Sequence, residues 1–306
     1  MLKFLDFQIL PFLLIVLPHL EKIQCATGAG LYVQSGHIPF QVILKHADDY
    51  YCGGVIYDEY TIITAAHCVK DRPVNGIRVW AGSVVPFQGE ARSASGYKLA
   101  PNYVKYGRND IALIRLSTPF RFNDKIGSVK LAPSGLYFST GTCFLSGFGY
   151  TSANSGATNL KEVIVNIRDP SVCENEYNSF DSLTMVCAGD LGTNACIGDS
   201  GGPLICNGVL YGTVSMVDST ECKATNVPTK FMNIAKFHEW IVTTANSFGS
   251  QNDINYRSYS GNNNYRTSGH ADFAGNVFNY AGSGSSFSSV GINGGQVWAR
   301  SWASSG

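Results

Sequence analysis

Short hydrophobic runs, broken by glycine, proline, asparagine and aspartate, recur along the chain from about residue 37 to residue 232. The runs are rich in β-branched and aromatic residues, and no long helical periodicity interrupts them. Many short strands separated by turn residues are typical of an all-β sandwich or barrel. The clearest runs are FQVIL at 40–44, TIIT at 61–64, IRVWA at 77–81, IALIRL at 111–116, EVIVNI at 162–167, PLICN at 203–207 and VLYGTV at 209–214.

A helical period appears only at the end of this region, where residues 233–245 read NIAKFHEWIVTTA. Ile234, Phe237, Trp240 and Ile241 follow one another at spacings of three, three and one residues, which places them on one face of a helix. The pattern predicts an amphipathic helix that docks on the β-rich body. We expect the domain to end soon after it, near residue 247.

The N-terminus begins MLKF and continues FQILPFLLIVLP, an apolar stretch of about a dozen residues. Spanning a bilayer takes about 20 apolar residues, so the stretch fits the core of a signal peptide better than a membrane helix. A short membrane anchor is the alternative, but the polar HLEK follows at once. Residues 1–26 are therefore predicted to be a signal peptide, which makes the protein secreted and leaves it without a membrane attachment after cleavage.

The composition changes after about residue 247, where serine, glycine and asparagine dominate and aromatic residues occur singly, as in NYRSYSGNNNYR. Such a segment cannot bury a hydrophobic core. Residues 248–306 are predicted to form a disordered, low-complexity tail. It is either an inert extension or a segment for self-association or attachment to an extracellular matrix.

Charge and cysteine content narrow the class of protein further. The 22 basic and 22 acidic residues cancel, which argues against electrostatic capture of nucleic acid or of a membrane surface. Nine cysteines in an exported chain indicate disulfides with one thiol left over, and cleavage near residue 26 would remove Cys25. Paired cysteines can also bind metal, but no C-x-x-C pair occurs, and neither a metal nor a cofactor is expected.

One stretch suggests chemistry: residues 196–204 read CIGDSGGPL and place Ser200 between glycines. Its composition is equally that of a glycine-rich turn. A serine hydroxyl is a weak nucleophile at neutral pH and needs a base, which in turn needs an orienting group. The function of Ser200 therefore depends on finding these partners.

Two further residues fit those roles. His67 follows the β-branched run of TIITAAHCV, and Asp110 stands immediately before the apolar strand of NDIALIRL. A buried carboxylate beside an imidazole would hold it in one tautomer. Taken singly, each residue also has a structural interpretation, as a core histidine and as an aspartate that caps a strand.

The order His67, Asp110, Ser200, within TAAHC, DIAL and GDSGGPL, resembles the trypsin and chymotrypsin family of serine proteases. The resemblance extends from about residue 31 to 245. It includes YCGGVI at 51–56, WAG at 80–82, SGFG at 146–149, VCAGD at 186–190 and VS at 214–215.

The resemblance implies an all-β fold of two packed six-stranded antiparallel β-barrels with a C-terminal helix, which would make residues 27–247 one protease domain. The divide between the barrels would lie near residues 118–132. It also implies four disulfides: Cys52 with Cys68, Cys143 with Cys206, Cys173 with Cys187, and Cys196 with Cys222.

The resemblance assigns roles to the site residues. Ser200 would attack a peptide carbonyl, His67 would accept its proton, and Asp110 would stabilise the imidazolium. The backbone N–H groups of Gly198 and Ser200 would form the oxyanion hole. Ser215 would bind the buried aspartate and line the path of the substrate backbone, although a strand-end serine explains it equally well from sequence alone.

The predicted substrate pocket departs from the trypsin pattern. Asn194 stands six residues before Ser200, where trypsin-like members have aspartate, so the pocket has no buried anion for Arg or Lys. Met216 replaces the usual tryptophan, while Val217 and Asn226 occupy positions that are glycine in open pockets. These residues resemble the elastase arrangement and predict a preference for small aliphatic side chains.

The start of the mature chain departs from the family as well. Related zymogens are cut to release an Ile-Val-Gly-Gly terminus, whose amine pairs with the aspartate before the nucleophile, here Asp199. The corresponding residues 27–30 read TGAG, and they are directly preceded by Cys25-Ala26 rather than by Lys or Arg. Either signal peptidase releases Thr27 as the inserting terminus, or Asp199 stays without its amine and the protein is a weak or inactive binder.

The sequence analysis therefore predicts a secreted serine endopeptidase. It would act on proteins or peptides and meet protein protease inhibitors. The alternative is a non-catalytic, protease-like binding protein.

Overall fold

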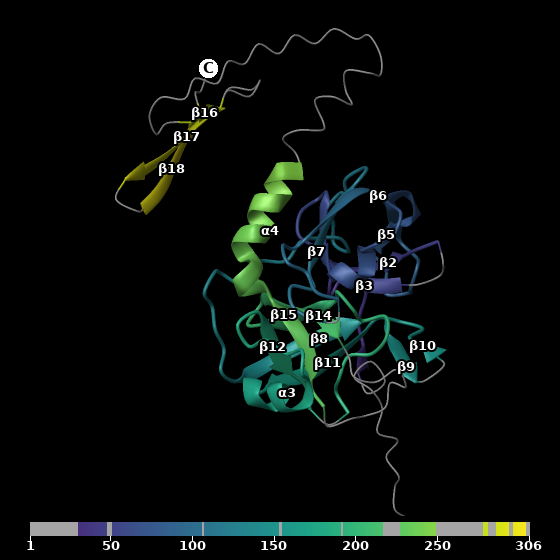
Figure 1. Ribbon diagram of the computed structural model, residues 1–306. Coiled ribbons are helices and arrows are strands. Elements are labelled where there is room, and N and C mark those ends of the chain that lie inside the picture. The colour runs from purple at the N-terminus through teal and green to yellow at the C-terminus, as the bar shows by residue number, and fades with distance from the viewer. Residues whose placement is uncertain are drawn as a thin grey trace, which may run out of the picture. The chain divides into compact units, whose positions relative to one another are not determined.

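The computed structural model describes residues 30–47, 51–105, 107–152, 155–190, 192–216 and 227–248, together with three strands between residues 278 and 303. The predicted signal peptide lies outside these residues. Six strands form a first closed antiparallel barrel in the order β2-β3-β4-β7-β6-β5 (Figure 1). They are β2 (Gln41–Lys45), β3 (Tyr51–Ile56), β4 (Thr61–Thr64), β5 (Arg78–Ala81), β6 (Glu90–Leu99) and β7 (Ala112–Leu116).

A second antiparallel barrel follows in the order β11-β12-β15-β14-β13-β8, and a pairing between β8 and β11 closes it. A short strand, β1 (Leu31–Tyr32), adds to β11 at its outer edge. The six barrel strands are β8 (Gly141–Gly147), β11 (Lys161–Ile167), β12 (Met185–Ala188), β13 (Pro203–Cys206), β14 (Val209–Met216) and β15 (Thr229–Asn233). The predicted fold class, two packed six-stranded β-barrels, is confirmed.

The strands that the hydrophobic runs predict are present because their side chains fill a barrel interior or the space between the barrels. All four residues of β4 are buried, and β4 pairs with β7 through its full length. One cluster of buried residues fills the first barrel. A second cluster joins residues of both barrels, so the two barrels share one continuous core.

Other elements lack a clear hydrophobic signal. β6 reads EARSASGYKL and buries few of its residues, yet it pairs with β5 and β7 and completes the first barrel. The helix α3 (Pro170–Glu176) begins after Asp169, whose carboxylate accepts from the N–H of Ser171. Aspartate before proline is a strong helix start, but the helix is too short for its period to be visible.

The predicted terminal helix is α4 (Ile234–Phe248), which begins one residue later and ends three residues later than the expected segment 233–245. Its buried face, which includes Phe237 and Ile241, packs into the core shared by the two barrels. The ring nitrogen Nδ1 of His238 also lies 2.9 Å from the carbonyl oxygen of Ala132. The helix therefore holds the two barrels together near the end of the domain.

Three disulfides that the resemblance implies are present. They join Cys52 to Cys68, Cys143 to Cys206, and Cys173 to Cys187. Cys196 is also disulfide-bonded, and its expected partner, Cys222, lies outside the described residues.

The tail forms a separate unit, from Tyr256 to Gly306. Within it, β16 (Phe278–Tyr280), β17 (Ser286–Asn293) and β18 (Gln296–Ala303) make a small antiparallel sheet. The expectation that residues 248–306 form a low-complexity tail stays a prediction. The segments SFSSVGIN and QVWARSWA contain β-forming residues at short intervals, and they pair residue for residue.

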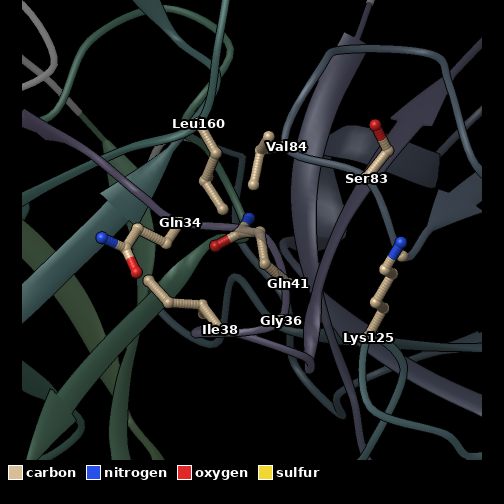
Figure 2. Close-up of a pocket in the computed structure, with 9 residues that line it drawn as sticks. Gln34, Gly36, Ile38, Gln41, Ser83, Val84, Lys125 and Leu160 are labelled. Atoms are coloured by element: carbon tan, nitrogen blue, oxygen red, sulfur yellow. The ribbon is translucent and has the colours of Figure 1, made fainter.

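A small pocket lies between the N-terminal segment and the first barrel (Figure 2). It is lined by Gln34, Gly36, Ile38, Gln41, Gly82, Ser83, Val84, Lys125 and Leu160. Its space suits a water molecule rather than a substrate. The buried amide of Gln41 accepts from the hydroxyl of Ser146 at 2.8 Å, so this region is a joint between the two barrels. Among the described residues, no helix has the length and apolar character needed to cross a bilayer.

Candidate active site

The local fold places His67 at the end of a buried strand. β4 ends at Thr64, whose hydroxyl donates to the carbonyl oxygen of Gly53 at 2.9 Å. The chain then forms a short helical turn, α2 (Ala66–Val69), which carries His67. The histidine side chain is 15% exposed, so most of the imidazole is packed against protein.

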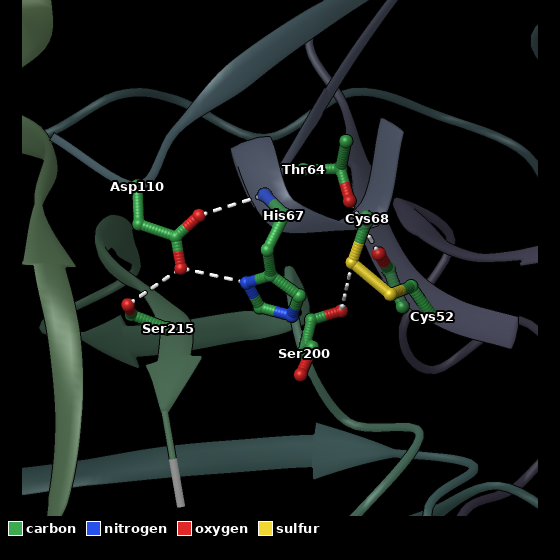
Figure 3. Close-up of a disulfide and its surroundings, with 8 residues drawn as sticks. Cys52, Thr64, His67, Cys68, Asp110, Ser200 and Ser215 are labelled. Atoms are coloured by element: carbon green, nitrogen blue, oxygen red, sulfur yellow. Dashed lines mark hydrogen bonds and ion pairs between the residues drawn. A yellow bond between two sulfur atoms is a disulfide. The ribbon is translucent and has the colours of Figure 1, made fainter. Parts of the chain in front are cut away.

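Asp110 lies immediately before β7, buried at 1% exposure, and its carboxylate accepts three hydrogen bonds (Figure 3). The backbone N–H of His67 donates to Oδ1 at 2.9 Å. The Nδ1 atom of the same imidazole lies 2.7 Å from Oδ2, and the hydroxyl of Ser215 donates to Oδ2 at 2.7 Å. Because Nδ1 faces a carboxylate, it carries the proton and Nε2 is free to accept one.

Ser200 stands in a tight turn between the barrels. Gly198 and Gly201 both have positive φ angles, of 93° and 80°, which glycine adopts without steric cost. The N–H of Gly53 donates to the carbonyl oxygen of Ser200 at 2.8 Å and ties this turn to the first barrel. Figure 3 shows Ser200 beside the imidazole of His67.

The sulfur of Cys68 lies 3.8 Å from the carbonyl oxygen of Ser200. This sulfur belongs to the disulfide with Cys52 and has no proton to donate, so the contact is one of packing. The disulfide lies on the side of Ser200 that faces away from Ser215 (Figure 3).

The carboxylate of Asp199 is fully buried next to the nucleophile. The N–H of Gly149 donates to its Oδ1 at 2.7 Å and the N–H of Cys196 donates to its Oδ2 at 2.8 Å. Burial raises the pKa of Asp199 to about 7, against the opposing effect of these two hydrogen bonds. A cation placed beside this buried carboxyl group would favour its ionised form.

Comparison with known proteins decides the family. The family model described as Trypsin matches residues 29–241, which is more than half of the chain. The chain belongs to the trypsin family. Trypsin alpha of Drosophila melanogaster is 36% identical over 242 residues, covering 76% of this chain and 91% of that protein. A trypsin of Sarcophaga bullata is 37% identical over 217 residues, covering 68% of this chain and 84% of its own.

Membership of the trypsin family makes the chain a serine endopeptidase, a hydrolase that acts on protein substrates. The fold and the arrangement around Asp110 agree with this assignment. The Drosophila erecta trypsin delta is similar to the same extent, 36% identical over 75% of this chain and 91% of its own.

Two of the predicted pocket residues, Asn194 and Ser215, have described side chains. Asn194 is buried at 6% exposure, and Ser215 is buried within β14. Ala195, which follows Asn194 in the chain, donates its N–H to the hydroxyl of Thr229 at 3.0 Å. Of the other predicted pocket residues, Met216 ends β14 but its side chain lies outside the described residues, as do Val217 and Asn226.

Two residues near the site were missed by sequence analysis. Thr229, the first residue of β15, contacts the loop of Asn194 through the hydrogen bond to Ala195. Met232, three residues later, accepts the backbone N–H of Asp110 on its sulfur at 3.2 Å. Both contacts join residues that are far apart in sequence, so no short motif contains either pair. Met232 and Asp110 are 122 residues apart, and Thr229 and Ala195 are 34 residues apart.

One group of side chains near the site has donor atoms close enough together to suggest a metal. Cys52, His67 and Cys68 place one ligand atom each within 4.8 Å of the others. The two sulfurs are joined in a disulfide, so neither is a thiolate. This group therefore does not fit a metal site.

Proposed function

We propose that the endopeptidase acts by acyl transfer, with Ser200 as nucleophile, His67 as general base and Asp110 as the group that orients the imidazole. In this scheme Nε2 of His67 accepts the proton of the Ser200 hydroxyl as the oxygen attacks the peptide carbonyl. The proton then passes to the leaving amine, an acyl-enzyme forms, and water hydrolyses it. The carboxylate of Asp110 stabilises the imidazolium throughout without taking its proton.

The observation that carries this proposal is the set of three hydrogen bonds at Asp110. Three hydrogen bonds hold the Asp110 carboxylate in one position beside the imidazole. A histidine that merely fills a core does not require such an arrangement. The test is hydrolysis of a fluorogenic peptide by the wild type and by Asp110→Asn. We expect the substitution to lower kcat about 10⁴-fold, the loss typical of a triad whose imidazole takes the wrong tautomer. Equal rates would overturn the assignment.

The backbone supports an oxyanion hole at the same turn. Among the hydrogen bonds of the described residues, neither the N–H of Gly198 nor that of Ser200 is used as a donor. Both are available to the oxygen of a tetrahedral intermediate, and one such donor contributes about 3 kcal/mol to the transition state.

The pocket supports a preference for small aliphatic residues before the cleaved bond. Asn194 carries no charge to bind Arg or Lys, and Thr229 adds a side chain beside it. We expect peptides with Ala or Val at that position to be cleaved faster than those with Arg. The variant Asn194→Asp should reverse this order toward Arg, while an unchanged order in both proteins would contradict the pocket assignment.

We further propose that Thr27 becomes the mature terminus and that its amine pairs with Asp199. β1 begins at Leu31, opposite Glu162 of β11, and Glu162 lies opposite Ser146 of β8. Neighbouring strands lie about 4.8 Å apart. The four residues that precede Leu31 are therefore long enough to span the distance from β1 to Gly147 of β8. The carboxylate of Asp199 occupies the space where a side chain of residue 147 would lie.

A second candidate function is a non-catalytic binding protein of the same fold. It is favoured by Asp199 itself, because two backbone N–H groups already satisfy its carboxylate without any amine. The two functions differ in one measurable property, the capacity of Ser200 to form an acyl-enzyme.

We also propose that the protein is secreted and that residues 1–26 are removed. Protein protease inhibitors would inhibit the mature enzyme. The disulfides are consistent with an oxidising compartment. A binding role for the tail, in self-association or matrix attachment, remains part of the proposal. Loss of a partner on deletion of residues 248–306 in a pull-down would support it.

A further inference from the structure

The peptide group between Ile197 and Gly198 carries one of the two N–H groups proposed to bind the oxyanion. Its carbonyl oxygen accepts the N–H of Tyr150 at 2.8 Å. The C=O and N–H of a trans peptide point in opposite directions, so this hydrogen bond also fixes the direction of the Gly198 N–H. That N–H points away from Tyr150 and donates to no acceptor in the described part of the chain.

Glycine at residue 198 does not hold this peptide group by itself. Gly198 has a φ angle of 93°, and a residue without Cβ changes its backbone conformation at little steric cost. If the peptide group rotated, the carbonyl oxygen of Ile197 would take the place of the N–H and repel an oxyanion. The orientation of the group therefore depends on what packs around it.

The ring of Tyr51, the first residue of β3, occupies the space beside Gly198. A Cβ on Gly198 would lie 2.9 Å from Cζ and 3.0 Å from Oη of Tyr51. A Cβ on Gly156, in β10 (Ser155–Gly156), would lie 3.1 Å from the same Oη. The ring thus lies against the turn that carries Ser200 and against the hairpin that β10 forms with β9 (Tyr150–Ser152).

The same ring contacts Tyr150, the residue that donates to Ile197. The two tyrosine rings are stacked, with centroids 6.1 Å apart and planes inclined by 29°. Phe87 adds an edge contact, with its centroid 5.7 Å from that of Tyr51. Tyr51 therefore touches the donor residue of the hydrogen bond and the residue that follows the acceptor. Because packed side chains leave few gaps, the ring sets the distance between them.

We propose that Tyr51 is a positioning residue for the oxyanion hole. Its ring holds Tyr150 and Gly198 at the separation at which the Tyr150 N–H reaches the carbonyl oxygen of Ile197, and this keeps the Gly198 N–H directed at the oxyanion. Without the ring, the turn and the hairpin shift, and only a fraction of the molecules has the N–H in place. The inference rests on the proposed acyl-transfer mechanism.

The first test is the hydrolysis of a fluorogenic peptide by two variants. Tyr51→Ala should lower kcat at least about tenfold, because complete loss of one oxyanion donor costs about 10²- to 10³-fold. KM should change less than about threefold, since the donor acts mainly in the transition state. Tyr51→Phe keeps the ring and should retain the wild-type kcat. A smaller fall in Tyr51→Ala, or an equal fall in Tyr51→Phe, would overturn the inference.

Tyr97→Ala is the control for a general loss of stability. Tyr97 lies in β6 and packs, partly buried, against the core of the first barrel. Its truncation should lower the melting temperature, as Tyr51→Ala does, and leave kcat unchanged. An equal fall in kcat in the two variants would make lost stability the cause and would also overturn the inference.

The second test observes the peptide group without any substrate. An isoleucine followed by a glycine occurs twice in the chain, at 126–127 and at 197–198. Protein labelled with isotopes at the isoleucine carbonyl carbons and the glycine nitrogens should therefore give two signals in a carbonyl–amide NMR correlation. Gly127, whose N–H donates to the carbonyl oxygen of Pro39 at 3.0 Å, is the internal control.

In the wild type and in Tyr51→Phe, the Gly198 signal should be single. In Tyr51→Ala it should broaden or double, while the Gly127 signal stays unchanged. An unchanged Gly198 signal in Tyr51→Ala would overturn the inference even if the mechanism is correct. If the wild type cleaves no substrate, the mechanism fails, and the Gly198 signal alone decides whether Tyr51 orients this peptide group.

Discussion

At the scale of single residues, the site is built around Asp110. Its carboxylate is fixed by His67 and Ser215, and its backbone N–H is fixed by Met232. The sequence motifs are sufficient to predict the carboxylate's partner His67, because TAAHC and DIAL each mark one half of the pair. The contact with Met232 could not be predicted, because a buried methionine in a β-strand looks the same whether or not its sulfur accepts a hydrogen bond.

The role of Met232 leads to a prediction about stability. Met232→Leu keeps the side-chain volume but removes the acceptor, which leaves the N–H of Asp110 buried without a partner. The free energy of unfolding should fall by about 1–3 kcal/mol, measured by urea denaturation. Met185→Leu is the matched control, since Met185 is also buried in a strand of the second barrel. A similar effect of both substitutions would show that the sulfur contact contributes nothing.

At the scale of elements, hydrophobic runs predict the strands whose side chains face the core. They fail for mostly polar strands that are held in the barrel by pairing with the strands on either side. β7 and β13 match their runs within a residue or two. β6 is mostly polar, and only the hydrogen bonds of β5 and β7 on either side make it a strand. The turn at Ser200 lies between these cases: the glycines Gly198 and Gly201 are evident in the sequence, but their close contacts are with β3 and β4 of the first barrel.

Gly147, at the end of β8, lies against Asp199 of the same turn and gives a prediction. A Cβ at this position would overlap the carboxylate of Asp199, whose Cγ would lie only 2.8 Å away. Gly147→Ala should therefore displace Asp199, abolish peptide hydrolysis and lower the free energy of unfolding by about 1–3 kcal/mol.

Gly96→Ala is the control for this substitution. Gly96 lies in β6, and a Cβ there meets no atom within 4 Å. The variant should keep the wild-type kcat/KM and melting temperature. Full activity of Gly147→Ala would show that the position of Asp199 does not govern the site.

At the scale of the whole molecule, the protease domain and the tail are different kinds of chain. The two barrels share one core, and the hydrophobic runs anticipate the strands that enclose it. The segment from Tyr256 to Gly306 is a separate unit with a small antiparallel sheet. In the proposed scheme the N-terminus connects this scale to the site, because the mature terminus would supply the amine that pairs with Asp199.

The pH dependence of stability should reveal that connection. Burial raises the pKa of Asp199 from 3.8 to about 7, so between these values the unfolded chain releases a proton that the folded chain keeps. Stability contributed by this group is thus present below about pH 4 and is lost as the pH rises to about 7. In protein that retains residues before Thr27, the loss should be on the order of 4 kcal/mol.

Asp199→Asn should remove this loss, because the amide does not titrate. Protein that begins at Thr27 should also lack it, since an ammonium group paired with Asp199 lowers the pKa of the carboxyl. Urea denaturation of the three proteins at several pH values between 4 and 7 makes the comparison. The same pH dependence in all three would exclude Asp199 as its source.

The central claim, that Ser200 is an activated nucleophile in a chain that needs no separate activating cut, is tested most directly by covalent labelling. Protein secreted from a eukaryotic host is treated with a fluorophosphonate, and its N-terminus is determined by mass spectrometry, with Ser200→Ala as control. We expect stoichiometric labelling of the wild type, no labelling of the Ser200→Ala variant, and a mature chain that begins at Thr27. Absence of labelling in protein that begins at Thr27 would contradict it and would favour the non-catalytic binding protein.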